Sequence, residues 1–198
     1  LDETGKLVKS AQEWLANPEV EIPELATKVH GVTTEHARTA GRNAKIVVSE
    51  IIAALRDYQQ AGIPVVAFNA PYDFTILHHE AIRHGLEPLS PVLVLDPLVL
   101  DKFVDAYRKG KRKLEVAAQH YGVVLSDAHN ATADAIAAGH VLQALVRQHS
   151  SKLAYTLNEL QTKQKEWEAA QTNSFAEYMR RSVNPDFQAE PGWPLKTL

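Results

Sequence analysis

Cysteine is absent from this chain of 198 residues, and so are long apolar runs. The lack of cysteine excludes disulfides and thiolate metal sites. No apolar run approaches membrane-spanning length and no signal-peptide pattern is present, so no membrane partner is expected and the cytoplasm is the default location. The net charge of −3 argues against a broadly basic nucleic-acid coat, but it leaves room for a local basic patch.

Methionine is also scarce, because Met179 is the only one and the chain starts with Leu1. A natural translation product should begin with methionine or show a processing signal, so we expect this chain to be a piece of a longer polypeptide. What is present is ordinary for a soluble globular protein: 45% hydrophobic and 23% charged residues. The length suits one domain plus an appendage.

Apolar periodicity predicts short buried strands that alternate with helices. Strands are expected at Val65–Asn69 and Pro91–Leu95, and each runs directly into a helix. The helices are expected at about 43–58, 73–84, 98–107, 114–121 and 131–148. Residues 20–41 are punctuated by proline and glycine and are expected to form a loop. This order indicates an α/β fold with a mostly parallel sheet flanked by helices.

The composition shifts past Ser150. Leu153, Leu157 and Leu160 follow helical spacing among Gln, Glu and Lys residues, until prolines break the pattern near the end of the chain. We therefore predict a domain over residues 1–150, followed over 151–198 by a helical extension and an irregular tail. The extension is expected to pack on the domain or on a partner.

Two predicted helix starts carry aspartates. Asp73 opens the helix that follows the first strand, and Asp134 lies near the start of the 131–148 helix, with His129 in the loop just ahead of it. Ligands of open α/β sheets bind at the C-terminal edge of the strands. Two carboxylates and a histidine on such turns indicate metal-assisted hydrolysis. For each aspartate alone, the alternative is an acid placed at a helix N-terminus by the helix dipole.

Three segments resemble those of the DEDD 3′–5′ exonucleases of the histidine subclass, the group that contains the proofreading subunit of bacterial replicative polymerase. Phe68–Asp73 is similar to the family's His-Asn-Ala-x-Phe-Asp motif, and His129–Asp134 is similar to its His-x-Ala-x-x-Asp motif. Val29–Thr33 is similar to its His-Gly-Ile-Thr segment. Order and separations fit over about residues 1–147. The departures are mild: Phe68 replaces the usual histidine, Tyr72 replaces phenylalanine, and Pro71 lies within the turn.

The resemblance implies a ribonuclease H-like mixed sheet flanked by helices, with a C-terminal helical extension. It implies stepwise removal of nucleoside monophosphates from the 3′ end of single-stranded DNA or RNA, with two Mg²⁺ or Mn²⁺ ions and a DNA polymerase subunit as a candidate partner. The residue roles that it implies are metal ligands at Asp73 and Asp134, a general base at His129, and substrate contacts at His30, Gly31, Asn69 and Phe74.

Several alternatives stay open. The whole protein could be an exoribonuclease of the same superfamily, or a non-catalytic module that binds nucleic acid or a polymerase. His30 and Gly31 could be a detail of loop packing, and Asn69 could cap the following helix. The basic loop Arg108–Lys113 could be a solvated turn or a contact to the phosphate backbone.

The segment Asp2-Glu3-Thr4-Gly5 only superficially resembles the family's first motif, Asp-x-Glu-Thr. The two acids of that motif alternate along a strand and so face the same side. Asp2 and Glu3 are adjacent and would face opposite sides, and the Gly-Lys that follows is typical of a turn. We predict a hairpin tip here, and we expect the strand bearing Asp-x-Glu to lie upstream of Leu1.

Overall fold

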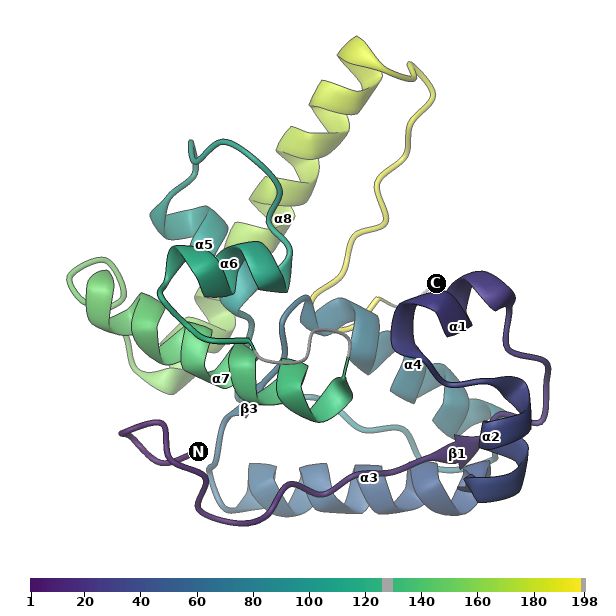
Figure 1. Cartoon of the computed structure of the whole chain (residues 1–198). Helices are drawn as coiled ribbons and strands as arrows, with labels where there is room; N and C mark the ends of the chain where they lie inside the picture. The colour runs from purple at the N-terminus through teal and green to yellow at the C-terminus, as the bar shows by residue number, and fades with distance from the viewer. Residues whose placement is uncertain (126–129, 197–198) are drawn as a thin grey trace.

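The computed structural model describes residues 1–125 and 130–196, in which helices surround two small sheets (Figure 1). Each sheet has two strands, and both pairs are parallel. The strands are β1 (Ala16–Asn17) paired with β2 (Arg42–Asn43), and β3 (Val65–Val66) paired with β4 (Val94–Leu95). The fold is thus α/β and rich in helix, as predicted, while the single mixed sheet stays a prediction.

The helices account for most of the described chain. They are α1 (Glu24–His30), α2 (Thr34–Ala40), α3 (Ala44–Gln60), α4 (Ala70–Arg83), α5 (Pro97–Val104), α6 (Leu114–His120), α7 (Ala131–Gln148) and α8 (Leu157–Ser182). The predictions for α3, α6 and α7 are confirmed to within a few residues. None of the described helices combines the length and the apolarity needed to cross a membrane.

Two expectations about these elements are wrong. Residues 20–41 are not a loop, because they contain α1 and α2. One of the glycines that suggested a loop, Gly31, closes α1 in the left-handed conformation, with φ 74°. The Thr33 hydroxyl then caps α2 by accepting from the His36 amide. The strand expected to reach Asn69 ends at Val66, and α4 begins earlier than predicted, at Ala70.

The core consists of two clusters of buried side chains. The first joins α5, α6 and α7 and is centred on fully buried residues such as Leu100, Val141 and Leu145. The second joins α3 and α4 to β4 and includes Trp193 from the end of the chain. The Trp167 side chain on α8 packs against both clusters. Full burial of one such large apolar side chain is worth about 1.5–3 kcal/mol.

Helix α8 packs along the edge of β4 that faces away from β3. Gln161 accepts a hydrogen bond from the Val94 amide, at 2.7 Å. Gln164 is completely buried, donates to the Val94 carbonyl at 3.0 Å and accepts from the Asp96 amide at 2.7 Å. Two side-chain amides therefore take the place of a neighbouring strand and satisfy the backbone groups of β4 on this side.

Beyond α8 the chain returns to the body of the molecule and passes α4 (Figure 1). Trp193 is buried in the second cluster, and the Lys196 amide donates to the Thr75 hydroxyl on α4 at 3.0 Å. Residues of the predicted extension thus contribute to the core of the predicted domain. The division at residue 150 into a domain and an extension stays a prediction.

Candidate active site at two helix starts

The first helix start follows β3 in the turn from Asn69 to Asp73. Asn69 has a left-handed backbone, with φ 68° and ψ 50°, and asparagine is one of the few residues that adopt it readily. Pro71 lies in the first turn of α4, where its missing N–H is not needed for helix bonding. The side chain of Asn69 makes no capping hydrogen bond to α4, so the capping alternative for this residue is wrong.

The cap of α4 comes instead from Asp96, at the end of β4. Its carboxylate is completely buried and accepts from the amides of Asn69 and Ala70, both at 2.9 Å. The same carboxylate accepts from the Leu98 amide at 2.9 Å and so caps α5 as well. Burial raises the pKa of Asp96, while these backbone donors and the Trp193 indole act to lower it. One buried carboxylate therefore holds the starts of two helices together.

Asp73 lies in the first turn of the helix that Asp96 caps. Desolvation by the surrounding protein raises the pKa of Asp73 to about 6, and the charge of Asp96 adds to this shift. The residue nevertheless remains exposed to solvent, so a ligand can reach its carboxylate. A raised pKa in an accessible carboxyl at the end of a parallel strand marks a candidate functional group.

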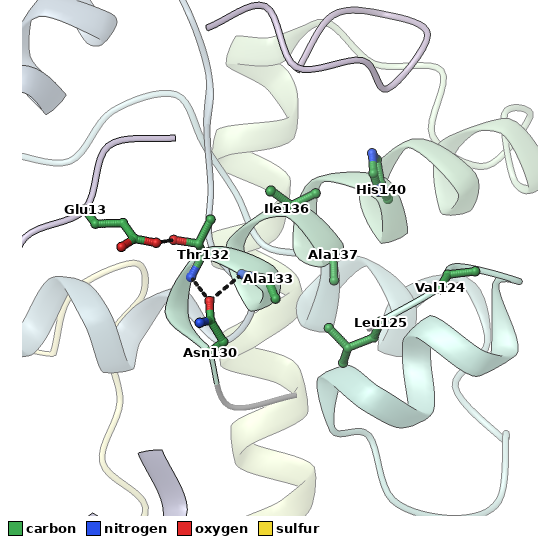
Figure 2. A pocket seen from close by; sticks show the side chains of 9 residues that line it. All are labelled: Glu13, Val124, Leu125, Asn130, Thr132, Ala133, Ile136, Ala137 and His140. Atoms are coloured by element: carbon green, nitrogen blue, oxygen red, sulfur yellow. Dashed lines mark hydrogen bonds between the residues drawn. The ribbon is translucent and has the colours of Figure 1, made fainter. Parts of the chain in front are cut away.

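The second helix start is that of α7. Asn130 caps it locally, because its side-chain oxygen accepts from the amides of Thr132 and Ala133, both at 3.1 Å (Figure 2). Asp134 follows in the first turn and is half-buried. Helix α7 packs against β3, the strand that leads into the Asn69 turn. His129, the predicted general base, lies outside the described residues.

A cavity of about 320 Å³ lies beside the start of α7 (Figure 2). Its walls include Asn130, Ile136 and His140 from the cap and helix, together with Glu13 from the N-terminal segment. The Glu13 carboxylate accepts a hydrogen bond from the Thr132 hydroxyl. Asp134 does not line this cavity, so the cavity adjoins the helix start but does not contain the predicted metal ligand.

The aspartates of the two helix starts carry the chemical groups that a divalent cation needs. Carboxylate oxygens are the ligands that Mg²⁺ and Mn²⁺ prefer, and the raised pKa of Asp73 means that a nearby cation would stabilise its charged form. Across residues 1–125 and 130–196, however, no three histidine or acidic side chains come together as a complete metal-binding group. The described residues thus form no complete metal site, and the roles of Asp73 and Asp134 as metal ligands stay predictions.

The remaining predicted substrate residues have structural contacts of their own. His30 ends α1, and its ring accepts from the Val32 amide at 3.1 Å. Gly31 donates to the Thr27 carbonyl as the C-cap of the same helix. Phe74 is only 6% exposed and packs in the second core cluster, so it anchors the start of α4 to the core. Direct contacts of these residues to a substrate stay predictions.

The turn predicted near the N-terminus is present, but within residues 1–125 no strand flanks it as a hairpin requires, since β1 begins at Ala16 and pairs in parallel with β2. The amides of Thr4 and Lys6 both donate to the Asp2 carboxylate at 2.9 Å, and the Asp2 amide donates to the Lys6 carbonyl at 2.8 Å. These hydrogen bonds lower the pKa of Asp2. The Asp2 side chain therefore stabilises a turn.

The basic loop divides into inward and outward residues. The guanidinium groups of Arg108 and Arg112 both pair with Asp101, which is completely buried and also accepts from the Tyr121 hydroxyl at 2.7 Å. Burial and the bond to Asp101 raise the pKa of Tyr121. The three lysines of the loop are exposed: Lys109, Lys111 and Lys113. Charge available to a partner therefore comes from the lysines rather than from the arginines.

Comparison with known proteins agrees with this arrangement. The model of the RNase_T exonuclease family matches residues 3–142, a span that includes both helix starts. The chain belongs to this exonuclease family, which confirms the resemblance to the DEDD exonucleases of the histidine subclass. It is also similar to a DNA polymerase III of the PolC type from Lacticaseibacillus paracasei, at 29% identity over 157 residues. That match covers 79% of this chain and 10% of the relative.

Sequence reasoning missed two residues that shape these helix starts. Asp96 directly follows the strand expected at Pro91–Leu95, and an aspartate before a proline at a strand-to-helix junction is a recognisable helix cap. Its second role is to cap α4, through hydrogen bonds to amides that lie 26 and 27 residues away in the sequence. The local sequence carries no signal of these bonds. Glu13 contacts Thr132, which lies 119 residues away in the sequence, and nothing in the local sequence around Glu13 predicts that contact.

Proposed function

We propose that this chain is part of the catalytic domain of a 3′–5′ exonuclease, and that the complete protein removes nucleoside monophosphates from the 3′ end of single-stranded DNA. The observation that carries the proposal is the Asn69–Asp73 turn: an accessible carboxylate with a pKa raised to about 6, fixed at the end of a parallel strand in a chain of the exonuclease family. DNA is proposed rather than RNA because the similar protein from Lacticaseibacillus paracasei is a DNA polymerase.

In this proposal Asp73 and Asp134 hold Mg²⁺ or Mn²⁺, in a site for two ions. When bound, the cations stabilise negative charge on the phosphate oxygens and on the leaving alkoxide. His129 accepts the proton of the attacking water, a role that suits a side chain titrating near neutral pH. Asn69, whose side chain makes no bond to the helix it precedes, is free to donate to the terminal nucleotide, together with His30.

The experiment is a degradation assay on the full-length protein. Single-stranded DNA and RNA of the same sequence, each with a free or a blocked 3′ end, are incubated with Mg²⁺ or Mn²⁺, and mononucleotide release is followed. We expect release from DNA with a free 3′ end, abolished by a 3′ block and by chelation of the metal. Preferential release from RNA would identify an exoribonuclease, and no release from any substrate would favour a binding module.

The general base is tested by the His129→Gln variant. We expect kcat to fall by about 10²–10⁴-fold, the usual contribution of a positioned base. The acidic limb of the pH–rate profile should also disappear, because a protonated histidine cannot accept a proton. An unchanged acidic limb in the variant would assign the base to another group.

A further inference from the structure

A buried polar network that the proposed chemistry does not use joins Asp96 to residues beyond the family match. That match ends at residue 142, whereas Gln164 lies on α8 and Trp193 in the returning chain. All three side chains are buried, with exposures of 0% for Asp96 and Gln164 and 4% for Trp193. A buried polar group without a partner costs free energy, so the loss of any contact within this network should destabilise the fold.

The carboxylate of Asp96 is held from two sides. Its Oδ1 atom accepts from the amides of Asn69 and Leu98, and its Oδ2 atom accepts from the Ala70 amide. The Trp193 indole N–H donates to the same Oδ2 atom at 3.3 Å. Trp193 is the side-chain donor in this set, so its indole limits rotation of the carboxylate that caps α4.

Gln164 fixes the backbone from which that carboxylate projects. Its side-chain oxygen accepts from the Asp96 amide at 2.7 Å, and its nitrogen donates to the carbonyls of Val94 and Leu160 at 3.0 and 3.1 Å. Both N–H donors of this side-chain amide are thus used and its oxygen holds one bond, so the amide cannot turn without breaking bonds on both sides. Residue 96 is therefore held in position at its backbone by Gln164 and at its carboxylate by Trp193.

The returning chain also touches α4 directly. Three residues after Trp193, the Lys196 amide donates to the Thr75 hydroxyl at 3.0 Å. Thr75 lies two positions beyond Asp73 on the same helix. The tail consequently contacts the start of α4 both through Asp96 and one half-turn beyond Asp73.

We propose that Trp193 and Gln164 are positioning residues for the active site, which act through Asp96 to hold the Asn69 turn and hence the carboxylate of Asp73. This inference rests on the proposed function, because it assigns the two residues a role in that reaction. The segment beyond the family match is then part of the working site. A displacement of a catalytic group by a fraction of an ångström is enough to slow a reaction without preventing binding.

The experiment compares two substitutions with two matched controls in the full-length protein. Trp193→Phe removes the indole N–H but keeps an aromatic ring in the core, and Gln164→Met removes the side-chain amide at similar volume. The controls are Trp167→Phe, at a tryptophan stacked on Phe103, and Gln161→Met, which removes the neighbouring bond to β4. Neither control residue bonds to Asp96.

Two measurements are made on each variant. Hydrogen exchange at the amides of Asn69 and Ala70, relative to core amides, reports the cap directly; we expect it to be about 5- to 10-fold faster in Trp193→Phe and Gln164→Met, the net effect of about one hydrogen bond. We expect kcat in the same two variants to fall by about 3- to 10-fold while KM stays within about twofold. The controls should change neither the relative exchange rate at Asn69 and Ala70 nor kcat, even where they lower the melting temperature.

Unchanged exchange at Asn69 and Ala70 in both variants would overturn the proposal, as would equal kcat losses in the controls. Hydrogen exchange does not depend on catalysis. It therefore tests whether Trp193 and Gln164 stabilise the Asn69 turn even if the unsubstituted protein hydrolyses no nucleic acid. That last outcome would overturn the proposed function, and with it the catalytic part of the inference.

Discussion

The two helix starts have the same local sequence pattern but differ in backbone conformation and in the source of their cap. Asn69 and Asn130 are each followed by alanine, and an aspartate stands four positions after each of them. Asn130 is extended and caps its own helix, whereas Asn69 is left-handed and leaves the cap to a carboxylate from another strand. A local cap is built by neighbours in sequence, while a distant cap couples the helix start to the packing of the whole core.

The largest effect that this comparison predicts is equal loss of activity at both starts. Asp73→Asn and Asp134→Asn should each lower hydrolysis by about 10³-fold or more, because loss of a direct metal ligand removes several kcal/mol of transition-state stabilisation. The double variant should be little worse than either single one, because the two groups act as a unit. A folded variant at either position with a near-normal rate would separate the two starts. Circular dichroism of each variant controls for folding.

Stability should distinguish the two caps. Asp96→Ala should lower the free energy of unfolding by about 2–4 kcal/mol, because three backbone amides lose their acceptor in a buried place. Asn130→Ala should cost about 1 kcal/mol, the usual value of a local helix cap. Urea unfolding followed by circular dichroism measures both. Equal losses would show that the buried carboxylate contributes no more than an ordinary cap.

The pH dependence of stability tests the surroundings of Asp73. Its pKa is raised from 3.8 to about 6, so between these values the folded protein binds more protons than the unfolded chain. The contribution of Asp73 to stability is therefore fully present below about pH 4 and is lost as pH rises through about 6. The free energy of unfolding of Asp73→Asn should therefore rise relative to that of the parent protein as pH increases through that window. The increase should be smaller than the pKa shift alone would give, because the residue is exposed. A difference independent of pH would contradict the shift.

The smallest expected effect lies in the basic loop, away from both helix starts. If the exposed lysines contact phosphates, Lys109→Gln and Lys111→Gln should each reduce the dependence of DNA binding on salt by about 0.7 in the log–log slope. Rates at saturating DNA should not change. Binding measured by fluorescence anisotropy from low to moderate salt tests this, with Lys45→Gln on α3 as the control. An unchanged slope would make the loop a solvated turn.

The contrast between the caps also explains what the sequence could predict. Helix α7 begins and ends where periodicity placed it, and its Asn130 cap lies immediately before it. The start of α4 was misplaced by three residues, because its cap is supplied from Asp96 and leaves no mark near residue 70. The loop expected at 20–41 failed for a different reason: Gly31 and Thr33 punctuate helices as readily as they form turns.

The candidate site divides in the same way. Asp73 and Asp134 were predicted from short motifs, because metal chemistry restricts which residue types can follow a strand or open a helix, and their role as metal ligands stays a prediction. Asp96, Trp193 and Gln164 were not found, since their importance lies in contacts between segments distant in sequence. The inward direction of Arg108 and Arg112 was equally hidden, because a run of basic letters does not show which of them meet a buried aspartate.

The two glutamines along β4 have a consequence for solubility. An open strand edge offers unpaired amides and carbonyls to any other extended chain, and natural proteins cover such edges to avoid uncontrolled self-association. Gln161 and Gln164 already occupy the Val94 amide and carbonyl and the Asp96 amide, so a second strand finds no groups to join there. Helix α8 thus acts as a gatekeeper against edge-to-edge aggregation, and until it docks during folding the edge of β4 stays open to other chains.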